Sequence, residues 1–149
     1  MKKVYLDTSI ISAYNDAREP EKLKQTREFL KKATQEVEIH VSSLVKDEVS
    51  AIKDTSRKKE LNALISTYKS LAITDKTREL AEYYINSGLI PESHIEDALH
   101  LAIATIYEMD ILISWNYTHL VKLKTRHLVN ALNLVRGYKE IEIILPIEY

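Results

Sequence analysis

The sequence predicts an α/β domain built on a mostly parallel sheet of about five strands. Short runs rich in β-branched and aromatic residues alternate with longer segments of helical periodicity, which is typical of strand–helix–strand units. The 149 residues contain only two glycines and three prolines, and no linker, repeat or low-complexity segment divides them. A chain of this length can bury roughly 70% of the surface that its unfolded state exposes. We therefore expect one domain spanning residues 1–149.

Five segments have the length and residue types of strands. Four of them are clear, and the fifth, near Leu71–Thr74, is weaker. The clear strands are Lys3–Asp7, Glu38–Val41, Ile111–Ser114 and Glu142–Leu145.

Amphipathic helices are expected between these strands. Apolar residues that recur at three- and four-residue intervals lie on one stripe of a helix and predict core packing. One such stripe is formed by Leu80, Ala81 and Tyr84, and its helix should end at Gly88 and Pro91. An earlier stripe comprises Leu61, Leu64, Ile65, Tyr68 and Leu71.

The composition excludes several classes of mechanism. The chain has no cysteine, which rules out disulfides, a thiolate nucleophile and zinc bound through sulfur. A composition of 45% hydrophobic and 29% charged residues is typical of a globular protein. No apolar run is long enough to cross a bilayer, and we expect no secretory or transit leader ahead of the first strand. A cytoplasmic location is the default expectation.

The charge of the chain is distributed unevenly. A formal net charge of −1 gives no overall electrostatic footprint for nucleic acid. From Tyr117 to Lys139, however, there is no Asp or Glu. This segment is either a surface that faces phosphates or a solvated helix face that lacks acids. Its basic residues are Lys122, Lys124, Arg126, Arg136 and Lys139, together with His119 and His127.

An acidic residue follows the first expected strand directly, in Val4-Tyr5-Leu6-Asp7-Thr8-Ser9. Ligands of open α/β sheets bind beyond the carboxyl ends of the strands, so Asp7 stands where a functional site is expected. Asp, Thr and Ser are also good N-cap residues, and Asp7 is equally placed to cap the helix that follows. Position alone leaves both interpretations open.

Glu48 lies on the apolar side of the helix expected after Ser43. At about 100° per residue, Glu48 falls within the apolar arc of this helix, whereas Asp47 falls outside it. Carboxylates rarely face a core unless a cation or a basic partner compensates their charge. Glu48 should therefore contact a bound cation or a buried Arg or Lys, or reach water at the edge of the arc. The arc consists of Leu44, Val45, Val49 and Ile52.

A third acid, Asp97, lies in the first turn of a helix that is apolar almost all the way round and is expected to be central. Ser93 and Glu96 have the spacing of a capping box, which gives Glu96 a structural role and leaves Asp97 without one. The helix dipole alone would also favour an acid at this position. His100, three residues further on, is either a ligand or orienting group or, as we expect, a hydrogen-bonded core histidine.

Polar residues also follow the strand expected at Ile111–Ser114. Asn116 is a candidate metal ligand through its carbonyl oxygen, and it is equally suited to cap a helix beginning near Tyr117. Ser114 could hydrogen-bond to a carboxylate that binds a metal, although a serine at a strand end more often contacts only water.

These motifs, in this order, resemble those of the PIN-domain nucleases, and in particular the VapC-like toxins of type II toxin–antitoxin systems. The resemblance spans essentially the whole chain. It implies a three-layer α/β/α domain with an acidic metal centre, cleavage of single-stranded RNA, a homodimer, and a cognate antitoxin that blocks the site. Many members carry a fourth acid where this chain has Asn116, and its loss should weaken metal affinity. The matching residues are Leu6-Asp7-Thr8-Ser9, Glu48 within Ser42–Ser50, Asp97 within Glu96–Ala102, and Ser114-Trp115-Asn116.

The resemblance implies that Asp7, Glu48 and Asp97 are the catalytic carboxylates, and oxygen ligands suit Mg²⁺ or Mn²⁺. An ion held by Asp7 and Asp97, with Glu48 binding directly or through water, would activate a water for in-line attack on a phosphodiester. One alternative is a catalytically weak or inactive module of the same fold that binds RNA or protein. A phosphatase or phospho-acceptor domain is disfavoured, because Ser9 stands where an aspartyl-phosphate phosphatase needs a second acid.

Overall fold

A wholly parallel sheet of five strands runs through the centre of the molecule in the computed structural model, which describes residues 1–149. The strand order is β3-β2-β1-β4-β5. Four strands lie within one residue of the bounds that the sequence predicts, because their apolar runs are buried between helices. The strands are β1 (Lys3–Leu6), β2 (Glu38–Ser42), β3 (Lys69–Leu71), β4 (Ile111–Ile113) and β5 (Glu142–Ile144).

The edge strand β3 is displaced from its expected position. Leu71 is its last residue, and Thr74 already caps the following helix. The first two residues of β3 are exposed, so this strand has no apolar run from which its bounds could be predicted. The preceding helix ends at Ile65, and the expectation that Tyr68 and Leu71 continue its apolar stripe is therefore wrong.

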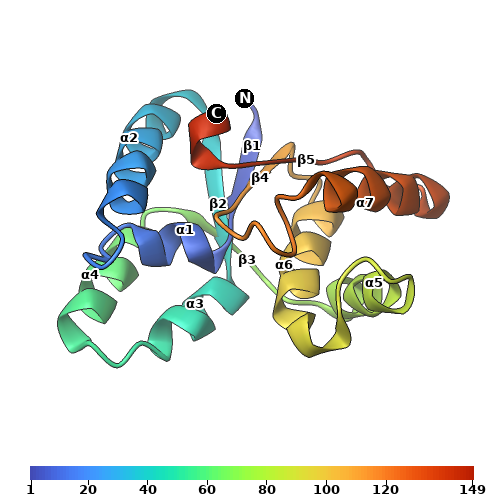
Figure 1. Ribbon diagram of the computed structural model, residues 1–149, viewed down its shortest axis with the longest axis horizontal. Coiled ribbons are helices and arrows are strands. Elements are labelled where there is room, and N and C mark those ends of the chain that lie inside the picture. Colours follow the sequence, from blue (N-terminus) through green and yellow to red (C-terminus); the bar gives the residue numbers. More distant parts are fainter.

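Seven α-helices cover the two faces of the sheet. Figure 1 shows α1–α4 on one side and α5–α7 on the other, which confirms the expected three-layer α/β/α arrangement. The α-helices are α1 (Thr8–Ala13), α2 (Pro20–Glu36), α3 (Ser43–Ser50), α4 (Thr55–Ile65), α5 (Asp75–Asn86), α6 (Ile95–Ile106) and α7 (Leu123–Arg136). Two short 3-10 helices are η1 (Glu92–His94) and η2 (Pro146–Glu148).

One continuous core joins these layers, and α6 is its central helix. Seven of the twelve residues of α6 are buried, as its all-round apolar sequence predicts. Buried polar groups tie it to its neighbours, since the Tyr84 hydroxyl of α5 lies 3.1 Å from Thr105 Oγ1 of α6 and 2.5 Å from Asn133 Oδ1 of α7. None of the helices combines the length and the apolar character needed to cross a membrane.

The order of the strands places a ligand site between β1 and β4. The chain fills one side of the sheet with β2 and β3 and then returns to the other side of β1 with β4 and β5. In open α/β sheets, ligands bind at the carboxyl ends of the strands where the order reverses in this way. Asp7 follows β1 and Ser114 follows β4, so both residues lie at this point.

Candidate active site

Asp7 is buried at the carboxyl end of β1, with only 3% of its surface exposed. Its Oδ1 accepts hydrogen bonds from Ser9 Oγ at 2.6 Å and from the backbone N–H of Ile10 at 3.3 Å, which makes Asp7 the N-cap of α1. Its Oδ2 accepts a hydrogen bond from Ser114 Oγ at 2.5 Å. Asp7 is therefore both the N-cap of α1 and an acid at the carboxyl edge of the sheet, so both interpretations of its position apply.

No ion pair compensates the charge of Asp7. No Lys, Arg or His forms an ion pair with it. Burial raises the pKa of Asp7, and the charge of His100 and the hydrogen bonds from Ser114 and Ser9 oppose this rise without cancelling it. A buried carboxylate is expensive unless its charge is compensated. The oxygen donors around it fit a hard divalent cation, which would supply that compensation.

Glu48 reaches the same edge of the sheet from α3. Its side chain is 33% exposed, whereas the neighbouring Asp47 is exposed, as the helical phase predicts. Glu48 Oε1 accepts a hydrogen bond from Thr8 Oγ1 at 2.7 Å and lies 2.8 Å from His100 Nε2. Burial favours the neutral acid, but His100 and Thr8 together outweigh it and lower the pKa of Glu48. Its protein partners are thus a histidine and a hydroxyl group.

A chain of hydrogen bonds holds His100 in place. His100 is buried, and its Nδ1 lies 2.7 Å from the Tyr5 hydroxyl, which lies 2.8 Å from Ser42 Oγ. In one arrangement of protons, Ser42 donates to Tyr5 and Tyr5 donates to His100 Nδ1. His100 Nε2 then keeps its proton and donates it to Glu48. His100 is the hydrogen-bonded core histidine that the sequence predicts, and it also orients Glu48.

Asp97, in the first turn of α6, faces two histidines. Its Oδ2 lies 2.9 Å from His119 Nδ1 and 3.8 Å from His94 Nδ1. These three residues form the only group of three His, Asp or Glu side chains whose ligand atoms all lie within 4.8 Å of one another. The three acids thus have separate partners: Asp7 contacts Ser9 and Ser114, Glu48 contacts Thr8 and His100, and Asp97 contacts His119.

The sequence did not point to Thr8, His94 or His119 as partners of the acids. The spacing of His94 and Asp97, three residues apart at the start of a helix, is one signal that could have been used. The position of His119 depends on the turn after β4 and has no comparable local signal.

The expected capping box between Ser93 and Glu96 does not form. A 3-10 helix over Glu92–His94 leads into α6, and it makes His94 the N-cap residue, without a side-chain hydrogen bond. Ser93 and Glu96 are both exposed. The prediction is wrong because the helix begins one residue later than the capping-box spacing requires.

Asn116 closes a turn at the end of β4. Its Oδ1 accepts a hydrogen bond from the backbone N–H of His119 at 3.0 Å, and its own N–H donates to Ser114 Oγ at 2.9 Å. The next helix begins at Leu123, so the expected helix start near Tyr117 is wrong. Ser114 therefore contacts both Asp7 and the turn, which is the supporting role that the sequence allowed for it.

Most cations of the segment from Tyr117 to Lys139 are paired with acids from elsewhere in the chain. Lys122 and Lys124 are exposed and form no ion pair. Both line a groove with Glu92 and Thr125. Of the lysines and arginines in this segment, these two are therefore the remaining candidates for contact with phosphates. The pairs are Arg126–Glu148, Arg136–Glu79 and Lys139–Asp110.

A second groove lies beside Asp7, and its lining includes Ser9, Lys22, Trp115 and Asn116. Trp115 is buried, and its Nε1 donates a hydrogen bond to Thr26 Oγ1 at 2.8 Å. Its ring therefore supports the groove from the core. Ser9, which donates a hydrogen bond to Asp7, connects this groove to the edge of the sheet where Asp7 lies.

Comparison with known families gives one match, in which the family model of the PIN domain matches residues 4–118. No curated protein sequence matches the chain.

Several solved structures share the fold. A toxin–antitoxin complex from Klebsiella pneumoniae is 17% identical with a TM-score of 0.61, covering 80% of this chain and 92% of that one. VapBC2 from Rickettsia felis, bound to a DNA fragment from its promoter, is 17% identical with a TM-score of 0.58, covering 96% and 98%. VapC20 from Mycobacterium tuberculosis, a Sarcin-Ricin loop cleaving toxin, is 14% identical with a TM-score of 0.58, covering 78% and 92%.

Proposed function

The chain belongs to the PIN domain family, and from this premise we propose that it is a metal-dependent endoribonuclease that cleaves single-stranded RNA. One observation carries the proposal. Asp7 is a buried carboxylate that forms no ion pair, at the point where open α/β sheets are expected to bind ligands. Perturbed acids in such positions are frequent in catalytic sites.

The proposed ion is Mg²⁺ or Mn²⁺, held by Asp7 and Asp97, with Glu48 binding directly or through water. Asn116 is a further candidate ligand, although its Oδ1 already accepts a hydrogen bond from the backbone. Asp97 Oδ1 has no hydrogen-bond partner in the protein, since His119 contacts only Oδ2. When bound, such an ion activates water for attack on a phosphodiester and neutralises charge on the phosphate.

The residues around the carboxylates orient them for this task. Ser9 and Ser114 each donate a hydrogen bond to Asp7, one to each oxygen. Thr8 and His100 fix the position of Glu48 Oε1. Hydrogen bonds of this kind fix the direction in which a metal-binding carboxylate points and tune its basicity.

The proposal extends to the role of a VapC-like toxin with a cognate antitoxin and a homodimeric state. Support comes from the similarity to the toxin–antitoxin structures and from apolar side chains that α6 and α7 leave exposed. Light scattering during gel filtration should give twice the chain mass of 17.2 kDa, and a monomer would contradict the dimer. The exposed residues are Ile95, Leu123, Leu134 and Val135.

A second candidate function is a catalytically weak or inactive module that binds RNA or protein. Asn116 favours it, because a neutral residue stands where many family members have a fourth acid. The near-neutral net charge also favours this candidate, because a chain with little excess positive charge should bind nucleic acid weakly.

Cleavage of a labelled single-stranded RNA by the full chain separates the two candidates. We expect cleavage with Mn²⁺, no cleavage with a chelator, and a loss of about 100-fold or more in Asp7→Asn and Asp97→Asn. Asp47→Asn, which changes an exposed acid next to Glu48, is the matched control and should cleave normally. Unchanged cleavage by both site variants would rule out the assignment, whereas RNA binding without any cleavage by the wild type would favour the second candidate.

A further inference from the structure

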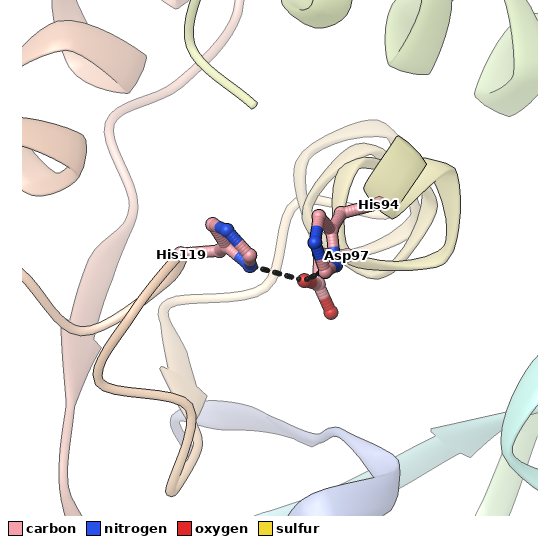
Figure 2. A group of neighbouring side chains, drawn as sticks. All are labelled: His94, Asp97 and His119. Atoms are coloured by element: carbon pink, nitrogen blue, oxygen red, sulfur yellow. Dashed lines mark hydrogen bonds and ion pairs between the residues drawn. The ribbon is translucent and has the colours of Figure 1, made fainter. Parts of the chain in front are cut away.

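We propose that His94, Asp97 and His119 form a binding site for a borderline transition-metal dication, with Zn²⁺ as the ion it fits best. Figure 2 shows His94 and Asp97 projecting from the start of α6 toward His119, which lies on the loop after β4. The cluster shares Asp97 with the proposed catalytic ion, but its two histidines distinguish it from the oxygen donors around Asp7 and Glu48. The inference does not depend on the nuclease function.

The distances within the cluster are close to those of a tetrahedral site. Asp97 Oδ2 lies 2.9 Å from His119 Nδ1 and 3.8 Å from His94 Nδ1, and all three ligand atoms lie within 4.8 Å of one another. Zinc binds nitrogen and oxygen at about 2.0–2.2 Å, which puts tetrahedral ligands roughly 3.3–3.5 Å apart. The two distances from Asp97 Oδ2 lie on both sides of this value, so binding of an ion would require rotation of these side chains.

The chemistry of the three ligands favours zinc over magnesium. Imidazole nitrogen suits Zn²⁺ and related transition ions, whereas Mg²⁺ prefers oxygen and dehydrates reluctantly. Two histidines and one carboxylate supply three ligands and leave the fourth position of a tetrahedron open to solvent or another ligand. His94 faces that solvent, because half of its side-chain surface is exposed, compared with 20% for Asp97 and 13% for His119.

The backbone around the cluster is held in place before any ion binds. His94 and Asp97 are three residues apart at the start of α6, so one rigid segment sets their spacing. The backbone N–H of His119 donates to Asn116 Oδ1, and its carbonyl accepts a hydrogen bond from Thr125 Oγ1, both at 3.0 Å. Asp97 and His119 alone could be an ordinary hydrogen-bonded pair. The third potential ligand, His94, is what distinguishes this cluster as a candidate metal site.

Calorimetric titration of the chelator-treated full chain with ZnCl₂ tests the proposal. We expect one Zn²⁺ per chain. Removal of a residue that only orients a metal ligand weakens metal binding about 10–100-fold. Removal of a ligand itself, in His94→Ala or His119→Gln, should therefore weaken zinc binding at least tenfold. His127→Ala, which removes an exposed histidine outside the cluster, is the matched control and should bind Zn²⁺ normally.

Asp7→Asn is the second control, because it separates this site from the proposed catalytic one. It should keep its zinc affinity even though it loses RNA cleavage. Absence of saturable zinc binding in the wild type, or full affinity in His94→Ala, would overturn the proposal. Loss of zinc affinity in Asp7→Asn alone would also overturn it, since the ion would then lie among the carboxylates. No RNA is present in this titration, so its outcome is independent of nuclease activity.

Discussion

Asp7 and Glu48 lie at the same edge of the sheet in opposite electrostatic environments. Burial dominates around Asp7 and raises its pKa, despite the opposing effects of His100 and the serine hydroxyls. Around Glu48 burial is also the largest influence, but His100 and Thr8 together reverse it and lower the pKa. Since a pKa shift reports which protonation state the fold prefers, folding disfavours the charge on Asp7 and favours the charge on Glu48.

In the metal-free protein, Asp7→Asn should raise the free energy of unfolding at pH 7. The raised pKa means that Asp7 stabilises the fold below its unfolded pKa of about 3.9, and that this contribution is lost as the pH rises through the folded-state pKa. The advantage of the variant should therefore grow from pH 4 to pH 7. Asparagine preserves the N-cap. Urea unfolding in chelator measures the difference, and a variant less stable than the wild type at pH 7 would refute this interpretation.

Glu48→Gln should have the opposite effect and lower the free energy of unfolding at pH 7. The contribution of Glu48 is present above its unfolded pKa of about 4.3 and is lost as the pH falls through the lower folded-state pKa. The deficit of the variant should shrink toward pH 4 in the same urea experiments. Asp47→Asn, on the exposed side of α3, is the control and should change stability little. An equal loss of unfolding free energy at pH 4 and pH 7 would contradict a stabilising role for the charge of Glu48.

At the scale of elements, one line of hydrogen bonds connects both helical layers through the sheet. It runs from Ser42 at the end of β2, through Tyr5 in β1 and His100 in α6, to Glu48 in α3. Each member is held by a neighbour from a different element, so the direction of Glu48 depends on the packing of the whole sheet edge. Satisfied networks of this kind fix a single arrangement of a core.

Tyr5→Phe tests this line of hydrogen bonds. The change removes the hydroxyl between Ser42 and His100 and leaves two buried polar groups without their partner. We expect the free energy of unfolding to fall by about 1–3 kcal/mol. Tyr117→Phe removes a hydroxyl from an exposed tyrosine and should change stability by less than about 0.5 kcal/mol. Chemical denaturation of both variants measures the difference, and equal stabilities would contradict the account.

At the scale of the whole molecule, the three acids come from both layers and from the sheet edge. Asp7 follows β1, Glu48 lies on α3 in one helical layer, and Asp97 lies on α6 in the other. An ion bound by all three would link the layers, and it would bind the folded chain far better than the unfolded one. Binding of such an ion would therefore be coupled to folding stability.

Manganese should raise the melting temperature of the wild type. At a free Mn²⁺ concentration about 100 times the dissociation constant, the stabilisation is about 2.7 kcal/mol, which corresponds to roughly 5–11 °C for a domain of this size. Asp7→Asn should lose most of this shift, whereas Asp47→Asn should keep it. A melting temperature that does not respond to Mn²⁺ in the wild type would contradict a shared ion.

The sequence predicts those parts of the fold that depend on local patterns. The strands β1, β2, β4 and β5 are apolar runs between helices, and the helical phase places Glu48 inward and Asp47 outward, as found. Prediction fails at β3, where exposed residues leave no pattern, and at the start of α6, where a 3-10 turn shifts the N-cap by one residue.

The candidate site depends on contacts that no local pattern encodes. The hydrogen bond from Ser114 to Asp7 joins residues 107 positions apart, and the contact of His100 with Glu48 spans 52. The pairing of Asp97 with His119 depends on the turn that Asn116 closes after β4. The sequence could therefore name the acids, but the partners that orient them became visible only in the structure.

The most direct test of the proposed catalytic ion is the anomalous scattering of Mn²⁺ in crystals of the full chain. We predict a peak within coordination distance of both Asp7 and Asp97, with Glu48 contacting the ion directly or through water. A peak confined to His94, Asp97 and His119, or no peak touching Asp7, would contradict it.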